Sequence, residues 1–314
     1  MHASVLKYFT EVARCGSMRK AAQHLFVAPS AINRQIRNLE DELAVELFDR
    51  LPSGLKLTPA GERLLKHIRE TLDGFHAMRA EFDAMKGERT GHISVIAMDS
   101  ALEKLLPAVI DDFGELFPAV TYAVQYAPLS SVAERVASGQ FDIGISFCQK
   151  APAGTRIAAT ASFASGAVLA ASHPLAKKDL VTFEECREYP IFQTGVNDEL
   201  PSPLSLEYSR HWEETKVHMQ SNSIRLIKSM VVRGRGVGFF TKLGFIDEID
   251  RDEVVWRPIA GVSDNTPPVA ILVPSPKELS PICEEFLNCL IRFFKQFEAL
   301  TQSIHESPRV QSRA

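Results

Sequence analysis

The stretch SMRKAAQHLFVAPSAINRQIRNLEDEL, residues 17–43, contains two short helical patterns of apolar residues with a break between them. Ser17 is suited to cap a helix over Met18–Leu25, and a further helix is expected over Pro29–Leu43. Apolar residues recur along this further helix in steps of four, three and four, at Ile32, Ile36, Leu39 and Leu43. Another face has a polar set, Ser30, Asn33, Arg34 and Arg37. The stretch therefore predicts two helices joined by a tight turn, the second with an apolar and a polar face.

The polar face of the second helix favours contact with DNA. Arginine can bind guanine edges and phosphates in a forked geometry, and asparagine can pair with adenine. A recognition helix presents the residues near its N-terminus to the major groove, and the acidic residues Glu40–Glu42 lie beyond this face. The alternative is a solvated face, which is the better interpretation of an isolated basic face. The preceding turn and the pairing of small polar residues with arginine favour DNA.

Further elements are expected on both sides of this stretch. The apolar residues before it recur at helical spacing, and Gly16 ends that first helix. After it, the turn signal Pro52-Ser53-Gly54 precedes a short strand at Leu55–Leu57, which predicts a two-stranded wing. We expect Arg50 and Lys56 to meet DNA phosphates, and Ser53 to be a further DNA-binding residue of the wing.

About the first sixty residues resemble the winged helix-turn-helix head of LysR-type transcriptional regulators. The resemblance is carried by Phe9, Val12, Gly16-Ser17, Ala21-Ala22, Leu25, Ser30-Ala31-Ile32, Arg34-Gln35-Ile36, Leu39-Glu40, Leu43, Leu47-Phe48, Arg50 and Leu57-Thr58-Pro59-Ala60-Gly61. Two positions depart from the family pattern: Ala28 replaces the common N-cap serine, and Asn33 stands where serine or threonine is frequent. The resemblance implies a DNA-binding head over residues 1–58.

A long helix is expected after the head, capped by Thr58 and with Pro59 at its first position. Its apolar residues follow a spacing close to a heptad seam, at Leu65, Ile68, Leu72, Phe75, Met78, Phe82 and Met85. A stripe that packs into ordinary core is the alternative, but the family resemblance implies that this helix pairs two subunits. We therefore expect residues 59–88 to form a linker and dimerisation helix that sets two heads on a pseudo-palindromic DNA site.

The rest of the chain alternates strands with helices after Gly91, which predicts an open, mainly parallel sheet. The expected helices include Leu102–Phe113 and Leu204–Glu213. Resemblance to the same family implies that residues 89–300 form a two-lobed α/β effector-binding domain with a periplasmic-binding-protein-like fold. Lobe I would cover about 92–161 and 267–300, and lobe II about 162–266. The polar tail, residues 301–314, is expected to be disordered.

Ligands of open α/β sheets bind beyond the carboxyl ends of the strands. The expected effector-binding residues are Ser100, Ser130, Phe147, Thr194 and Ser223. The three serines each stand where a helix begins, so hydroxyls and free amides there favour an anion such as a carboxylate. Their alternative role is that of ordinary N-caps. Few basic residues flank these turns, which leaves a small, weakly charged or partly apolar effector as a second candidate.

Composition and motifs argue against several other classes of protein. The five cysteines form no CxxC pair and lack metal-ligand spacing, so we expect reduced thiols in the cytoplasm and no metal site. The first residues lack the pattern of a secretory signal, and no run of eighteen apolar residues occurs, so no membrane partner is expected. The GxGxG glycines of residues 234–238 follow a helical pattern, the reverse of a dinucleotide-binding loop, and no cofactor is expected.

The favoured hypothesis is a bacterial-type LysR-like transcription factor that is not an enzyme. Residues 1–90 hold 14 lysine and arginine residues against 12 aspartate and glutamate residues, whereas the whole chain has a net charge of −4. The expected partners are double-stranded DNA, a small-molecule effector bound between the lobes, and further copies of the chain in a homodimer or homotetramer. RNA polymerase is an additional candidate. The alternative is a metabolite-binding protein or enzyme whose N-terminal helices serve only oligomerisation.

Overall fold

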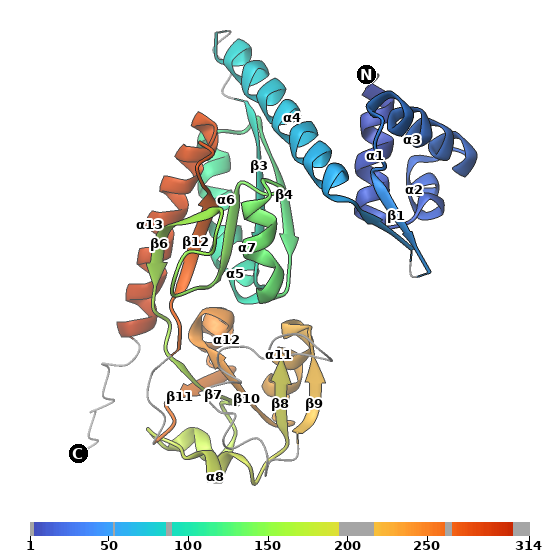
Figure 1. Ribbon diagram of the computed structural model, residues 1–314. Helices are drawn as coiled ribbons and strands as arrows, with labels where there is room; N and C mark the ends of the chain where they lie inside the picture. The colour runs from blue at the N-terminus through green and yellow to red at the C-terminus, as the bar shows by residue number, and fades with distance from the viewer. Residues whose placement is uncertain (1–2, 53, 86–89, 195–216, 261–265, 304–314) are drawn as a thin grey trace, which may run out of the picture. The chain divides into compact units, whose positions relative to one another are not determined.

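Figure 1 shows the computed structural model, which describes residues 3–52, 54–85, 90–194, 217–260 and 266–303. The chain divides into two compact units, Met1–Glu81 and Phe82–Ala314. The first unit holds the head and most of the linker helix, and the second holds two five-stranded sheets. Within the described ranges, no helix combines the length and the apolar character that crossing a membrane requires.

Three helices build the head, and the predicted limits of the second and third are confirmed. They are α1 (Ala3–Cys15), α2 (Met18–Leu25) and α3 (Pro29–Leu43). Ile32, Ile36 and Leu39 of α3 are buried in the core of the head, as their spacing predicted. Leu43 is 41% exposed, so its predicted burial is wrong. It is the last residue of α3, and the chain turns away directly after it through Ala44, whose φ is +53°.

The two helices of the helix-turn-helix differ in how they begin. The side chain of Ser17 accepts a hydrogen bond from the Lys20 N–H (3.4 Å) at the start of α2. Ala28 has the extended backbone of an N-cap at the start of α3, but it provides no side-chain hydrogen bond. The missing cap predicted from the sequence is confirmed, and such a cap typically contributes about 1 kcal/mol to helix stability.

The predicted wing is an antiparallel pair of strands, β1 (Phe48–Leu51) and β2 (Gly54–Leu57). The start of β2, next to the turn of the wing, contacts the turn between α1 and α2: the Leu55 N–H donates to the Gly16 carbonyl over 2.8 Å. A Cβ on Gly54 would lie 2.7 Å from that same carbonyl oxygen, and its φ is +128°, so this approach requires glycine. The wing is thereby fixed to the helical part of the head.

Thr58 caps α4 (Pro59–Met85), as predicted, because its hydroxyl accepts the Gly61 N–H over 3.1 Å. Leu65 and Ile68, near the start of α4, are buried in the core of the head. Three later positions of the expected seam, Phe75, Met78 and Phe82, are 54%, 40% and 50% exposed. This exposed apolar row suits a pairing surface, and the dimerisation role of α4 stays a prediction.

The first sheet of the second unit, with the helices around it, is lobe I. Its strand order is β4-β3-β5-β12-β6. The strands are β3 (Gly91–Ala97), β4 (Val120–Tyr126), β5 (Ile143–Phe147), β6 (Thr155–Ala161) and β12 (Val269–Pro274). β4, β3 and β5 are parallel, but β12 is antiparallel to both β5 and β6. Four of the five strands therefore run in the same direction, as predicted for a mainly parallel sheet, and β12, which enters the sheet after the chain returns from the second lobe, is the exception.

Helices cover both faces of lobe I. α6 (Leu105–Leu116) and α13 (Pro281–Ser303) pack on one face, and α7 (Leu129–Ala137) packs on the other (Figure 1). A separate short helix, α5 (Asp99–Glu103), ends before α6 begins, so the predicted single helix over Leu102–Phe113 is wrong. Pro107 explains the break, because it has no N–H for the Glu103 carbonyl and its ring would clash with that carbonyl.

Lobe II contains the second sheet, with the order β11-β7-β10-β8-β9. The strands are β7 (Ser165–Ala170), β8 (Ile191–Thr194), β9 (Val217–Ser221), β10 (Val237–Thr241) and β11 (Val254–Arg257). α11 (Ile224–Val232) packs on one face, and α8 (Phe183–Cys186) packs on the other together with η1 (Pro174–Lys177). The predicted helix over Leu204–Glu213 lies outside the described residues.

The expected disorder from residue 301 onward is wrong for residues 301–303, which belong to α13. The helix continues to Ser303, and Thr301 is buried, with 4% of its surface exposed. Its carbonyl accepts a 2.7 Å hydrogen bond from Nζ of Lys242, which belongs to η2 (Lys242–Phe245) after β10. This contact fixes the end of the helix, whereas residues 304–314 lie outside the described part of the chain.

Candidate DNA-binding face and effector site

The polar face of α3 presents exposed side chains. Ser30, Arg34 and Arg37 are all exposed and are spaced by four and three residues, so they share one side of the helix. Neither arginine forms an ion pair with any residue that the structure describes. Both guanidinium groups therefore keep their donors available for a phosphate or a base edge.

Asn33 differs from its neighbours on this face. Its side-chain oxygen is buried, and it has no hydrogen-bond partner among the described residues. Leaving a buried acceptor unpaired typically costs about 1–3 kcal/mol. A paired contact with adenine needs both the amide oxygen and the amide nitrogen, so Asn33 would have to turn outward to make one.

The two basic residues of the wing that were predicted to contact DNA lie on different faces of its two strands. Lys56 pairs with Asp49 across the two strands, and Arg50 pairs with Leu55. Residues directly opposite in an antiparallel pair point to the same face, and successive residues point to opposite faces. Arg50 and Lys56 are both exposed, but they lie on opposite faces of the wing. Ser53, the third predicted wing contact, lies outside the described residues.

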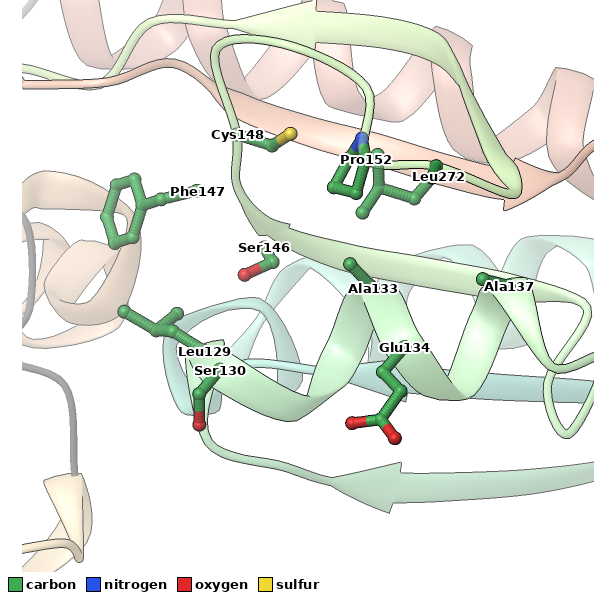
Figure 2. Close-up of a pocket in the computed structure, with 11 residues that line it drawn as sticks. Leu129, Ser130, Ala133, Glu134, Ala137, Ser146, Phe147, Cys148, Pro152 and Leu272 are labelled. Atoms are coloured by element: carbon green, nitrogen blue, oxygen red, sulfur yellow. The ribbon is translucent and has the colours of Figure 1, made fainter. Parts of the chain in front are cut away.

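A pocket of about 520 Å³ lies in lobe I between α7, the end of β5 and the segment that follows β5. Two of the five predicted effector residues, Ser130 and Phe147, are brought together in its lining. Figure 2 shows that the hydroxyl of Ser146 is directed from β5 toward the start of α7. The volume lies in the range of small-molecule sites, and most of the lining is apolar.

The charge in the lining of this pocket is negative. Among the described lining residues the charged one is Glu134, which is exposed and has its carboxylate directed away from β5 (Figure 2). Neither lysine nor arginine is found among these described lining residues. Cys148 also lines the pocket; burial raises the pKa of its thiol, which donates to the Lys150 carbonyl over 3.0 Å. Such a pocket provides acceptors and apolar surface, and no cation for a carboxylate ligand.

The other three predicted effector residues lie elsewhere. Ser223 is the N-cap of α11, and its hydroxyl accepts the Leu226 N–H over 3.4 Å. Ser100 is the second residue of α5, and Thr194 ends β8; neither lines the pocket. For Ser223, the structure thus shows the ordinary capping role that the sequence left open.

The start of α11 is also occupied by a carboxylate from the other lobe. Oδ2 of Asp99 accepts the N–H of Ile224, the first residue of α11, over 3.3 Å. The pKa of Asp99 is raised, and the largest cause is the burial of its carboxyl group. The position where the sequence suggested that an anion binds is therefore filled by the chain's own acidic side chain.

Charged side chains connect the two lobes beside this contact. Nζ of Lys228 lies 3.0 Å from Glu103 of lobe I and 3.0 Å from Glu248 of lobe II. Nζ of Lys104 lies 2.7 Å from Asp247 and 2.8 Å from Asp250, both in α12 (Ile246–Asp250). We call these ion pairs the lobe joint. They connect α5 and the residue after it to α11 and α12, and so favour one arrangement of the lobes.

These additional residues differ in how far the sequence could have identified them. Ser146 is a polar residue inside the apolar run FDIGISF, residues 141–147, and that irregularity could have identified it. The members of the lobe joint had no such signal, because each pair across the lobes joins residues more than a hundred positions apart.

Family models match both units of the chain. Residues 4–62 match the model described as "Bacterial regulatory helix-turn-helix protein, lysR family". Residues 86–295 match the model described as "LysR substrate binding domain". A similar protein is the transcriptional dual regulator GltC of Bacillus subtilis, which is 28% identical over 306 residues. That alignment covers 95% of this chain and 99% of GltC.

Solved structures of full-length proteins share the fold. The crystal structure of CbnR with its target DNA has a TM-score of 0.62 and 20% identity, covering 93% of this chain and 100% of CbnR. Full-length OxyR from Pseudomonas aeruginosa has a TM-score of 0.61 and 20% identity, covering 94% of this chain and 95% of OxyR. At this level of identity the likeness shows the fold.

Proposed function

The chain belongs to the LysR family of DNA-binding transcriptional regulators with an effector-binding domain, and from this premise we propose that the polar face of α3 reads its operator. The observation that supports this most is the exposure of Arg34 and Arg37 without an ion pair among the described residues. Ser30 and a reoriented Asn33 would contact the same groove. Arg50 and Lys56, on opposite faces of the wing, would contact phosphates on its two sides.

The proposed arrangement of the subunits is based on the exposed apolar row of α4. The exposed apolar row at Phe75, Met78 and Phe82 would pair with the same row of a second copy. A homodimer places two heads on a pseudo-palindromic double-stranded operator, and two such dimers would form a homotetramer. The protein would act in the cytoplasm, regulating RNA polymerase rather than catalysing a reaction. The alternative, in which the head serves only oligomerisation, is set aside because the head matches a DNA-binding family.

The effector would occupy the pocket between α7 and β5. Its apolar lining, the inward hydroxyl of Ser146 and the lack of basic lining residues favour an uncharged or cationic molecule with an apolar part. The start of α11 is a poorer site for an anionic effector, because a ligand carboxylate would meet the negative charge of Asp99 there. The described lining residues all belong to lobe I, whereas the sequence predicted an effector between the lobes. Binding would change the arrangement of the subunits by its differential affinity for two arrangements of the lobes.

Capture of genomic DNA fragments tests the operator proposal. Purified full-length protein at low ionic strength should enrich fragments that share a motif with two half-sites. The variant Asn33→Ala should enrich a motif altered at one position in each half-site, because only one base contact per head is removed. Equal recovery of all fragments by the wild-type protein would refute the proposal.

A variant that fills the pocket tests the effector proposal. Ala133 lines the pocket, so Ala133→Trp should abolish the thermal stabilisation by a bound metabolite. The control is Ser138→Trp, which places the same ring at the exposed residue after α7, outside the pocket. A screen of uncharged, cationic and anionic metabolites should give stabilising compounds from the first two groups. An anionic compound that still stabilises Ala133→Trp would contradict the proposed site and class.

A further inference from the structure

Three different ligand atoms converge between α1 and α2 of the head. Glu11 and Cys15 lie one turn apart on α1, and His24 lies in the last turn of α2. Nδ1 of His24 is 2.9 Å from Oε1 of Glu11 and 3.6 Å from Sγ of Cys15. Sγ of Cys15 is 3.4 Å from the same glutamate oxygen. One sulfur, one nitrogen and one oxygen therefore surround a single point.

This donor set and its spacing match a tetrahedral zinc ion. Zinc prefers cysteine sulfur, histidine nitrogen and carboxylate oxygen, with bond lengths of about 2.3 Å to sulfur and about 2.0 Å to nitrogen and oxygen. A tetrahedral ion then places sulfur and nitrogen about 3.6 Å apart and sulfur and oxygen about 3.5 Å apart. The observed 3.6 and 3.4 Å agree. The distance between nitrogen and oxygen would widen from 2.9 to about 3.3 Å.

A cationic nitrogen already lies at this point. Nη2 of Arg14 is 2.5 Å from Oε1 of Glu11, 2.6 Å from Nδ1 of His24 and 3.6 Å from Sγ of Cys15. Arginine can only donate, so Nδ1 of His24 accepts from Arg14 in the tautomer that carries its proton on Nε2, whereas in the other tautomer the Nδ1–H donates to Glu11 over 2.9 Å. In the first tautomer the lone pairs of the glutamate and the histidine converge on one positive charge, as metal binding requires.

We propose that Glu11, Cys15 and His24 form a zinc site in which the metal displaces the guanidinium of Arg14. The side chain of Arg14 is 57% exposed, so it can turn into solvent while a water molecule takes the fourth position. Cys15 binds as the thiolate and releases its proton to solvent. The ion would connect α1 to α2, which share one apolar core with α3, through side chains that are not among those proposed to read DNA.

Cobalt(II) provides a spectroscopic test, because a thiolate ligand gives an intense charge-transfer band. The metal-free, full-length protein should bind one cobalt ion per chain, and zinc should displace it. Cys15→Ser should remove the band, and His24→Ala should weaken binding at least tenfold. The control variants Cys148→Ser and Cys289→Ser should keep it. A band that survives Cys15→Ser, or no band in the wild-type protein, would overturn the proposal.

Arg14 provides a sharper test, because its removal should have the opposite effect. Arg14→Met should bind cobalt at least tenfold more tightly, since the metal no longer competes with a guanidinium; unchanged or weaker binding would overturn the proposal. Zinc should also slow hydrogen exchange of residues 3–25 in the wild-type protein and not in His24→Ala. DNA binding by the metal-free protein is measured in parallel. Retained DNA binding with no metal binding would refute the zinc site and leave the operator proposal intact.

Discussion

In the head, most of the residues proposed to read DNA lie within one 15-residue helix, whereas the contacts that join the lobes of the effector domain link distant parts of the chain. Lys228 and Glu103 are separated by 125 positions, and Lys104 and Asp250 by 146. The functional face of α3 is held by an apolar core beneath it and is free of described ion pairs. The lobe joint depends on partly buried charges that compensate one another. We therefore expect substitutions in the joint to cost more stability than changes at the start of α3.

The largest effect is expected for Lys228→Met in the lobe joint. The side chain of Lys228 is 9% exposed and lies between two carboxylates. Its loss leaves Glu248 without a described ion-pair partner and leaves Glu103 with the exposed Arg225 alone. The free energy of unfolding of the effector domain should fall by about 3 kcal/mol. Urea unfolding followed by tryptophan fluorescence measures this, because both tryptophans, Trp212 and Trp256, belong to this domain.

Arg225→Met is the matched control for that comparison. Arg225 also contacts Glu103, over 3.3 Å, but its side chain is 84% exposed. Its removal should change the free energy of unfolding by no more than about 0.5 kcal/mol. If the two variants lose the same stability, burial does not decide the strength of the joint, and the contrast drawn here is wrong.

The next effect is a pH dependence caused by Lys242. Burial lowers the pKa of this lysine to about 8, from 10.5 in the unfolded chain. Between these two values the unfolded state binds a proton that the folded state has lost, so the free energy of unfolding should increase as the pH rises. The increase should reach about 3 kcal/mol near pH 10.5.

Lys242→Met isolates this effect from the other groups that titrate at alkaline pH. The ammonium of Lys242 contacts only the Thr301 carbonyl and the ring of Trp256, 4.6 Å from its centre, among the described residues. The free energy of unfolding of the wild type should therefore rise relative to that of Lys242→Met as the pH increases from 8 to 10.5. A difference that is constant over this range would show that Lys242 titrates normally.

The smallest effect is expected in the head. Ala28 has the backbone conformation of an N-cap but no side-chain hydrogen bond, so Ala28→Ser should stabilise α3 by about 1 kcal/mol. Amide hydrogen exchange of residues 30–43 should slow about fivefold. Ala31→Ser, within the first turn of the same helix, should give no such protection. Faster exchange in Ala28→Ser would mean that the position is constrained by something other than capping.

The difference between the two regions also explains what the sequence could predict. The limits of α2 and α3 and the missing cap at Ala28 were predictable, because periodicity and capping depend on neighbours within one turn. The break at Lys104 could have been read from Pro107. The buried oxygen of Asn33 and the placement of Asp99 at the start of α11 depend on packing between separate elements. Sequence spacing alone does not reveal such contacts.

The central claim is that α3 reads a DNA sequence through its exposed arginines. The most direct test compares the affinities of wild type and Arg34→Ala for an operator and for a scrambled duplex at one fixed salt concentration. Arg34→Ala should lose about 1–3 kcal/mol of preference for the operator. Arg63→Ala, which removes an equal charge from α4, should leave that preference unchanged. A wild-type protein without preference, or an Arg34→Ala variant that keeps it in full, would contradict the account.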